Sequence, residues 1–250
     1  MEGMKAPKGG GVLVRALLVI LLVGSITASA CGNDHEPTRT KSSDRITIHG
    51  RATLDGAPFD AQFLGAVVRR HGLITPCQAE IPPVTRGRYE INVFAQRAGS
   101  GCGVPGAQVL LWTYVRESKL YSTSVLTWPQ RANVANFDAQ FSTAIPNGDA
   151  PAVTELSGEV FDRDGRRLPP GTRVEAYIGT TRCGIASVRH AGEHFTGYIL
   201  SVVGPDSIRG CSQGAQITFR ISDRPAAETS VNRLTPPAPG SGGSFRLTQS

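Results

Sequence analysis

An internal repeat limits the possible folds of this chain more than any other feature. Five short matches occur in the same order in both halves of the chain, at offsets of 106 to 109 residues. One match is the tripeptide Gly-Ala-Gln, at 106–108 and again at 214–216. The others pair Gly50 with Gly158, Cys77 with Cys183, Tyr89 with Tyr198, and Thr123 with Thr229. Because solenoid repeats are far shorter, this period indicates two domains of similar fold.

Apolar side chains in both halves recur at every second position, which is the period of a β-strand and not of a helix. The pattern is clear at 89–94, 109–114 and 217–221, where we expect one buried face. Asp-Gly turn signals at 55–56 and 164–165 separate such segments. The expected strands are 46–53, 62–70, 87–95, 107–115, 119–127 and 134–142, then 154–162, 172–179, 184–190, 194–203, 214–222 and 243–249.

Six or seven short strands in a repeat of this length predict an antiparallel β-sandwich in each half. We therefore expect an all-β chain with two tandem β-sandwich domains. The predicted boundaries are 1–30 for a signal peptide, 31–45 for a lipidated N-terminus and flexible tether, 46–143 for the first domain, 144–153 for a linker and 154–250 for the second domain.

The first 30 residues have the three-part layout of a secretory signal peptide. Lys5, Lys8 and Arg15 are basic, residues 16–23 form an apolar core, and residues 24–30 are small or polar. The core is much shorter than the roughly 20 apolar residues of a membrane-spanning helix. We expect the chain to be exported.

Two processing outcomes are open at the end of this segment. Ala-Ser-Ala at 28–30 is an A-x-A cleavage site, which would release a soluble protein. Residues 28–31, Ala-Ser-Ala-Cys, also resemble the lipobox of bacterial lipoproteins, although Ala28 stands where Leu is usual. This resemblance implies that Cys31 is lipidated on its sulfur and becomes the new N-terminus.

The other four cysteines form one pair in each half. An exported chain meets oxidising conditions, so paired cysteines are first interpreted as disulfides. Of the three possible connectivities, the repeat selects Cys77 with Cys102 and Cys183 with Cys211. Cys31 is then left over, as a lipidated cysteine should be. A zinc site is disfavoured because the C-x₂-C spacing of zinc ligands is missing.

Residues 46–250 resemble bacterial extracellular modules of the Ig-like, carboxypeptidase-regulatory and transthyretin-like type. The shared elements are a first strand ending near an Asp-Gly turn, a Tyr-x-x-x-Val strand at 89–93 and 198–202, and a Gly-Cys…Gly-Ala segment before an apolar strand. The resemblance implies structural modules that stiffen, space or bind, and that seldom catalyse.

Trp112 and Trp128 are the candidate ligand platform. Both lie in the first half, and the second half has Arg220 and Leu234 at the nearest aligned places. Tryptophan on a sandwich face belongs either to the core or to an exposed surface for carbohydrate or protein. The core is the more frequent location. If a ligand surface exists, however, the difference between the halves makes Trp112 and Trp128 the first candidates for it.

No metal, cofactor or catalytic residue is expected. His190 and His194 have the i, i+4 spacing of helical metal ligands, but they flank a predicted turn between strands. The Asp-Arg-Asp-Gly stretch at 162–165 begins like a calcium loop without its twelfth-position glutamate, which favours a β-turn. The motifs of serine hydrolases, zinc proteases and dinucleotide-binding proteins are missing.

The sequence thus predicts a non-enzymatic lipoprotein on the outer face of a bacterial cell membrane. Its partners would be the membrane, through the lipid, and an envelope protein or polysaccharide. The net charge is +6 for the whole sequence and +4 without residues 1–30, where three basic residues and Glu2 lie. This excess is mild, and no basic cluster is interleaved with aromatic residues, so no nucleic-acid partner is expected. The alternative is a secreted enzyme or enzyme inhibitor with a site at the inter-domain junction.

Overall fold

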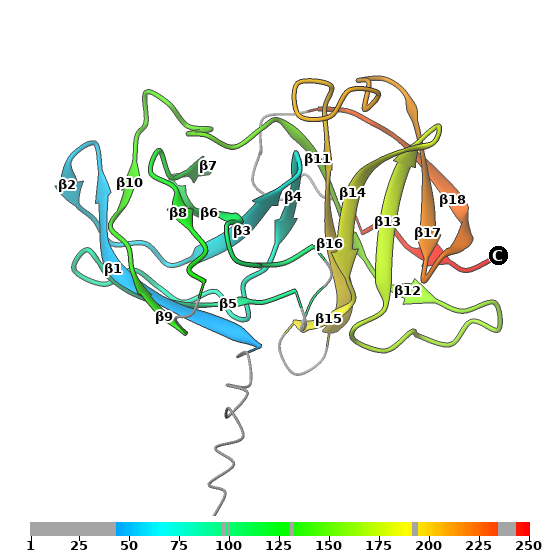
Figure 1. Ribbon diagram of the computed structural model, residues 1–250, viewed down its shortest axis with the longest axis horizontal. Coiled ribbons are helices and arrows are strands. Elements are labelled where there is room, and N and C mark those ends of the chain that lie inside the picture. The colour runs from blue at the N-terminus through cyan, green and yellow to red at the C-terminus, as the bar shows by residue number, and fades with distance from the viewer. Residues whose placement is uncertain (1–43, 97–98, 100, 131–132, 192–194, 235–243) are drawn as a thin grey trace, which may run out of the picture. The chain divides into compact units, whose positions relative to one another are not determined.

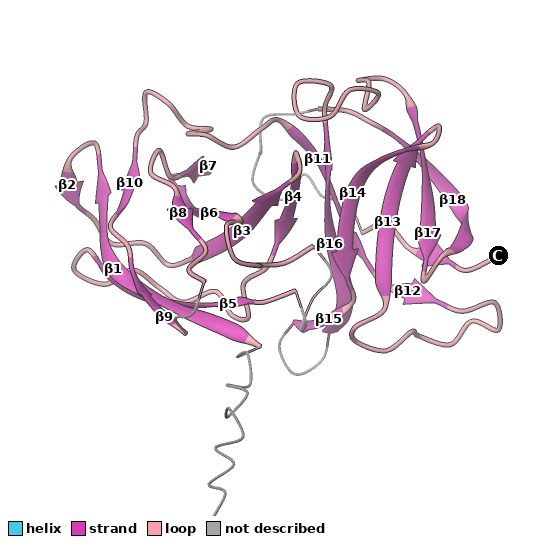
Figure 2. Ribbon diagram, viewed as in Figure 1, coloured by secondary structure: helices cyan, strands magenta, loops and turns pink. Residues whose placement is uncertain are grey.

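Strands are the regular elements of this fold. The computed structural model describes residues 44–250 without 97–98, 100, 131–132, 192–194 and 235–243, and none of the residues it describes is helical (Figure 1, Figure 2). The predicted all-β fold class is therefore confirmed. Within this described part, no helix is long and apolar enough to cross a membrane.

The described residues of the first half form ten strands in two sheets, one built on β1 and the other on β3 and β6. β1 pairs with β2, β5, β9 and β10, while β3 pairs with β4 and β6, and β6 with β7 and β8. The strands are β1 (Arg45–Leu54), β2 (Ala57–Pro58), β3 (Leu64–Arg70), β4 (Leu73–Pro76), β5 (Arg88–Phe94), β6 (Gln108–Val115), β7 (Ser118–Tyr121), β8 (Leu126–Thr127), β9 (Val134–Asn136) and β10 (Ala139–Phe141).

The second half builds a four-stranded sheet in the order β14-β13-β17-β18 beside a sheet in the order β11-β16-β15, and β12 pairs with β19. The strands are β11 (Val153–Gly158), β12 (Val160–Phe161), β13 (Arg173–Ile178), β14 (Thr181–Ser187), β15 (Arg189–Ala191), β16 (Phe195–Val203), β17 (Gln216–Ile221), β18 (Arg224–Val231) and β19 (Leu247–Thr248).

In the first half, a glycine and a tyrosine on neighbouring strands contact the chain segment between β9 and β10. Gly50 on β1 lies opposite Tyr89 on β5, and the Tyr89 hydroxyl donates to the carbonyl oxygen of Phe137. A Cβ atom at Gly50 would lie only 1.9 Å from that same oxygen. Glycine is therefore required here, because the chain between β9 and β10 passes directly over it.

The second half repeats this arrangement. Gly158 on β11 lies opposite Tyr198 on β16, and the Tyr198 hydroxyl donates to the carbonyl oxygen of Phe245 at 2.8 Å. A Cβ atom at Gly158 would lie 2.3 Å from this oxygen. Two of the sequence matches thus occupy the same structural positions in the two halves.

Two hydrophobic clusters form the core, and one of them extends across both halves. β3 and β6 bury both faces: Ala66 and Val68 belong to the cluster inside the first half, whereas Val67 belongs to the shared cluster. The prediction of a single buried face at 109–114 was therefore wrong, because second-half side chains cover the other face of this sheet. The shared cluster includes Val67, Leu110, Trp112, Tyr121, Val153, Leu156, Ile185 and Val203.

Several predicted strands have different bounds. The expected strand at 119–127 is divided into β7 and β8, that at 134–142 into β9 and β10, and that at 154–162 into β11 and β12. β18 was not predicted, because its alternating exposed pattern carries no large apolar residue before Val231. β18 forms because it pairs with the neighbouring strand β17.

The predicted linker packs along β7. Tyr121 N donates to Pro146 O at 2.8 Å, Arg69 Nη1 donates to Asp149 O at 2.6 Å, and Ala150 is buried. Residues 42–250 form one compact unit. The division of this unit into two domains at 144–153 stays a prediction.

Candidate functional site

The disulfides join the residues that the repeat paired. Cys77 is bonded to Cys102 with a Cα–Cα distance of 5.6 Å, and Cys183 to Cys211 with one of 5.7 Å. All four residues are fully buried. Cys31, the predicted lipidation site, lies outside the described residues.

Both tryptophans lie in the core. Trp112 is 8% exposed and Trp128 is 7% exposed. Trp112 covers Gly65, and Trp128 covers Gly103, where an added Cβ atom would lie 2.1 and 2.0 Å from the respective indole. Neither side chain offers an exposed face, because each fills the space above a glycine.

The counterpart of Trp128 in the second half is Asn232 and not Leu234. Trp128 N donates to Ala107 O at 2.7 Å, and Asn232 N donates to Ala215 O at 2.9 Å in the equivalent place. Asn232 is fully buried. Its Oδ1 accepts from the Thr154 hydroxyl at 2.7 Å, and its Nδ2 donates to the carbonyl oxygens of Val203, Cys211 and Ser212. A polar network therefore replaces an indole in the second half.

An ion pair ties β7 of the first half to β11 of the second. Lys119 Nζ lies 3.0 Å from Glu155 Oε2, and the lysine side chain is only 5% exposed. The ammonium group also lies 4.6 Å from the ring centroid of Trp112 and 5.4 Å from that of Tyr121. Burial raises the pKa of the Tyr121 phenol, which reflects how dry this contact is.

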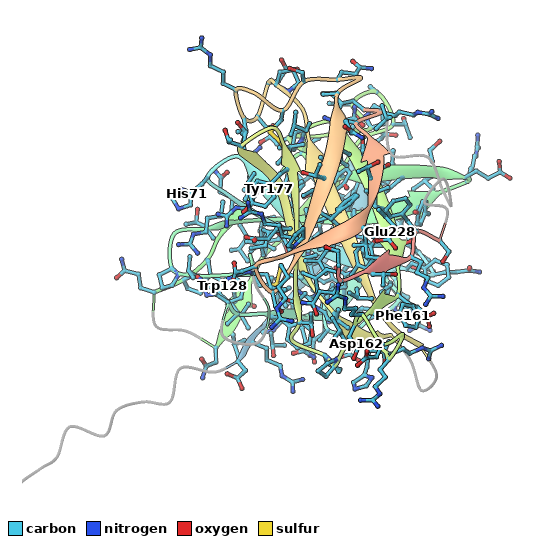
Figure 3. The ribbon with its side chains drawn as sticks, turned by 90° about the vertical axis from the view of Figure 1, so that its right-hand side faces the viewer. His71, Trp128, Phe161, Asp162, Tyr177 and Glu228 are labelled. Carbon is cyan, nitrogen blue, oxygen red and sulfur yellow. A yellow bond between two sulfur atoms is a disulfide. The ribbon has the colours of Figure 1, made fainter. Side chains whose placement is uncertain are left out.

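The sequence-predicted turn at 162–165 is confirmed as a turn. Asp162 Oδ1 accepts hydrogen bonds from the backbone N–H groups of Asp164 and Arg166, at 3.0 and 2.8 Å (Figure 3). His190 lies on β15 and its Nδ1 pairs with Thr196 Oγ1 at 2.9 Å, whereas His194 lies outside the described residues. In the part of the chain described, no three His, Cys, Asp or Glu side chains converge on a metal site.

A cavity of about 440 Å³ lies where the two halves meet; we call it the junction cavity. The first half contributes one wall, from the end of β4 and the residues after it in sequence, and the second half contributes the other, from β14, β15 and β16. Figure 1 labels these strands. Two of its large apolar side chains, Ile81 and Ile199, are 45% and 38% exposed. The lining residues are Pro76, Gln78, Ala79, Glu80, Ile81, Ser187, Arg189, His190, Gly197, Tyr198 and Ile199.

Arg189 is a partly buried charged residue in this wall. Its Cζ lies 4.9 Å from the ring centroid of Phe94, and its Nη2 lies 2.8 Å from Cys102 Sγ. Its Nε is buried and has no hydrogen-bond partner in the described structure, and the same holds for Gln78 Oε1 nearby in the lining. Burial lowers the pKa of Arg189 to about 10, because the charged form loses its hydration.

Two carboxylates of the described residues, Glu80 and Glu175, already have hydrogen-bond partners. Glu80 accepts from Asn92 Nδ2 at 2.9 Å. On the outer face of β13, which Tyr177 marks in Figure 3, the buried Glu175 accepts from Arg182 Nη1 at 2.8 Å. No sequence signal pointed to Arg189, since the residues around it in the cavity come from segments about a hundred positions apart.

Comparisons with known proteins find no matching family model and no matching curated protein. Solved structures with a distant likeness are a streptococcal ancillary pilin, the SpaE basal pilin of Lactobacillus rhamnosus GG and the SpaA shaft pilin of the same strain. Their sequence identities are 5%, 8% and 9%, and their TM-scores are 0.27, 0.24 and 0.21. The matches cover 84%, 82% and 83% of this chain, and 63%, 88% and 98% of the respective pilins. TM-scores this low assign neither a fold nor a function to the chain.

Proposed function

We propose that this chain is a bacterial surface lipoprotein without catalytic activity. It presents a disulfide-braced β-sandwich unit on the outer face of the cell membrane, for binding or for spacing at the envelope. The observation that carries this proposal is the use of the cysteines. Four of the five are closed in Cys77–Cys102 and Cys183–Cys211, so Cys31 alone is left for another chemistry.

The sequence around Cys31 supports attachment to lipid. The cysteine follows the small and polar residues 24–30 at the end of a signal-like segment, and it precedes a polar stretch at 32–45 that contains no large apolar side chain. A diacylglyceryl group on Cys31 supplies two acyl chains, which meets the requirement for stable anchoring.

The contacts between the halves support presentation of one stiff unit. The shared hydrophobic cluster, the buried Lys119–Glu155 pair and a bond from Thr75 Oγ1 to Ile185 O at 3.2 Å all join the first half to the second. A stiff unit that is joined to the anchor through residues 32–45 would present its outer surface away from the bilayer. The partner there would be an envelope protein or a polysaccharide.

The test is cell fractionation with intact-mass measurement of the mature protein. Wild-type protein is expected in the membrane fraction, beginning at Cys31 and heavier by the mass of its acyl groups. Cys31→Ser should abolish this mass increase, whereas Asn33→Ala, two residues further on, should keep it. A mature protein in the medium that begins at an unmodified Cys31 would refute lipid anchoring.

The secreted alternative has one specific feature in its favour. The junction cavity lies between the halves, where an enzyme or inhibitor made of two sandwich domains would hold its site. Recovery of wild-type protein from the medium would therefore direct attention to this cavity.

A further inference from the structure

We propose that the junction cavity binds an N-acylated apolar amino acid through its carboxylate, with Arg189 as the anion-binding residue. Free acyl amino acids and the C-termini of peptides share this chemistry. The proposal goes beyond anchoring and spacing, since neither of those requires a small ligand.

The charge of Arg189 is the first argument. A guanidinium that is largely removed from water is normally kept with a carboxylate. Even Arg182, whose side chain is 46% exposed, pairs with Glu175 at 2.8 Å. Arg189 instead lies against the Phe94 ring and the Cys102 sulfur, and no carboxylate of the described residues forms an ion pair with it. The fork of a guanidinium matches a carboxylate bidentately. Among the described residues, therefore, Arg189 has no ion-pair partner, and a carboxylate ligand would supply one.

The walls of the cavity supply the second argument. A volume of about 440 Å³ is within the range of roughly 300–1,000 Å³ that small-molecule sites have. Ile81 and Ile199 leave large apolar side chains exposed at this cavity, and Pro76 and Tyr198 extend the apolar lining. A ligand with a branched aliphatic side chain would cover these surfaces and leave its carboxylate for Arg189.

Gln78 supplies the third argument, which concerns the amide. Its Oε1 is a buried acceptor without a partner. Gln78 lines the cavity, and the terminal torsion of a glutamine side chain is broad, so its amide group can rotate. There its oxygen would accept the N–H group that an acyl amino acid carries next to its carboxylate. Ligand binding would then satisfy two polar groups whose burial is otherwise unfavourable.

The experiment is isothermal titration of the full-length mature protein in nanodiscs with N-acetyl-leucine. N-acetyl-leucinamide, which has the same shape and no charge, is the matched probe. We expect the acid to bind at least tenfold more tightly than the amide. Equal binding of the two probes, or binding of neither, would overturn the proposal.

Variants separate a ligand role of Arg189 from a structural role. Arg189→Gln should weaken binding of the acid tenfold or more, while the exposed control Arg209→Gln should leave it unchanged. The melting temperature of Arg189→Gln should not fall, because the variant removes a buried charge without a carboxylate partner. Unchanged affinity in Arg189→Gln would contradict the assignment.

Two further variants keep the proposal testable if Arg189→Gln fails to fold. Gln78→Glu places a negative charge beside the expected carboxylate and should abolish binding of the acid, and Ile199→Ser should weaken both probes. Failure of either effect would count against this site. A short peptide ending in leucine then separates the two sources: tighter binding than N-acetyl-leucine indicates a peptide C-terminus, and exclusion of the peptide indicates the free acid.

Discussion

Replacing Glu155 with glutamine should destabilise the fold more than its partial exposure suggests. The carboxylate of Glu155 is the ion-pair partner of Lys119, at 3.0 Å, and the lysine side chain is only 5% exposed while the glutamate side chain is 32% exposed. The change to glutamine keeps the size of the side chain at 155. It leaves the ammonium of Lys119 buried between two aromatic rings without its counter-charge.

The magnitude follows from two opposing effects. Removing one partner of a fully buried ion pair costs about 3–5 kcal/mol. Solvent at Glu155 and the attraction of the ammonium to the rings of Trp112 and Tyr121 reduce this, so we expect a loss of about 2 kcal/mol in the free energy of unfolding. Lys119→Met, which fills a similar volume without a charge, should cost less than about 1 kcal/mol.

Urea unfolding provides the assay, with the midpoint and the m-value both measured. The matched control is Glu159→Gln, because Glu159 is 27% exposed and pairs with Arg167 at 2.6 Å, but that arginine is 57% exposed. This surface pair should contribute less than about 1 kcal/mol. If Glu155→Gln and Glu159→Gln are equally stable, or if Lys119→Met is the most damaging of the three, the reasoning is wrong.

Three other changes test separate parts of the fold. The double variant Cys183→Ser, Cys211→Ser opens a disulfide loop with a sequence separation of 28. It should lower the free energy of unfolding by about 3 kcal/mol, measured from the urea midpoint. A loss below about 1 kcal/mol would mean that packing alone orders this loop. Gly158→Ala should cost more than about 2 kcal/mol in the same assay, because its Cβ atom would lie 2.3 Å from Phe245 O. In the control Gly165→Ala, nothing lies within 4 Å of the new Cβ atom, so this change should cost only the strain of its positive φ. Equal losses would show that the backbone at Phe245 moves away from position 158 without cost. Burial raises the pKa of Tyr198 above its usual value of about 10, so above that pH the unfolded state releases a proton that the folded state keeps. The contribution of Tyr198 to stability should be constant below about pH 10 and fall as pH rises above it, so stability should fall less steeply in Tyr198→Phe. An identical alkaline slope in the variant would refute this assignment.

The alternation of apolar and polar residues was sufficient to predict those strands whose form depends mainly on residues close in sequence. The period-two alternation in β5 and β17 predicted those strands within one or two residues, since each has one face on the core and one in solvent. The repeat selected the disulfide partners, because equivalent cysteines occupy equivalent places in the two halves.

Contacts between distant segments were beyond local pattern. Second-half residues cover the outer face of β3 and β6, so Trp112 is buried by side chains far from it in sequence. The junction cavity depends on the same contact, since its lining residues Gln78 and Arg189 come from different halves of the chain. Nothing in the residues around Arg189 distinguishes it from the chain's many surface arginines.

The position of β1 has a mechanical consequence. Tension applied through the residues that precede Arg45 runs along this ten-residue strand, which pairs with β5 over seven positions and with the parallel strands β9 and β10 at three positions each. Such a pull loads the pairs together in shear and does not open them one after another. A chain held to a membrane at that end would therefore resist drag through the whole width of its first sheet.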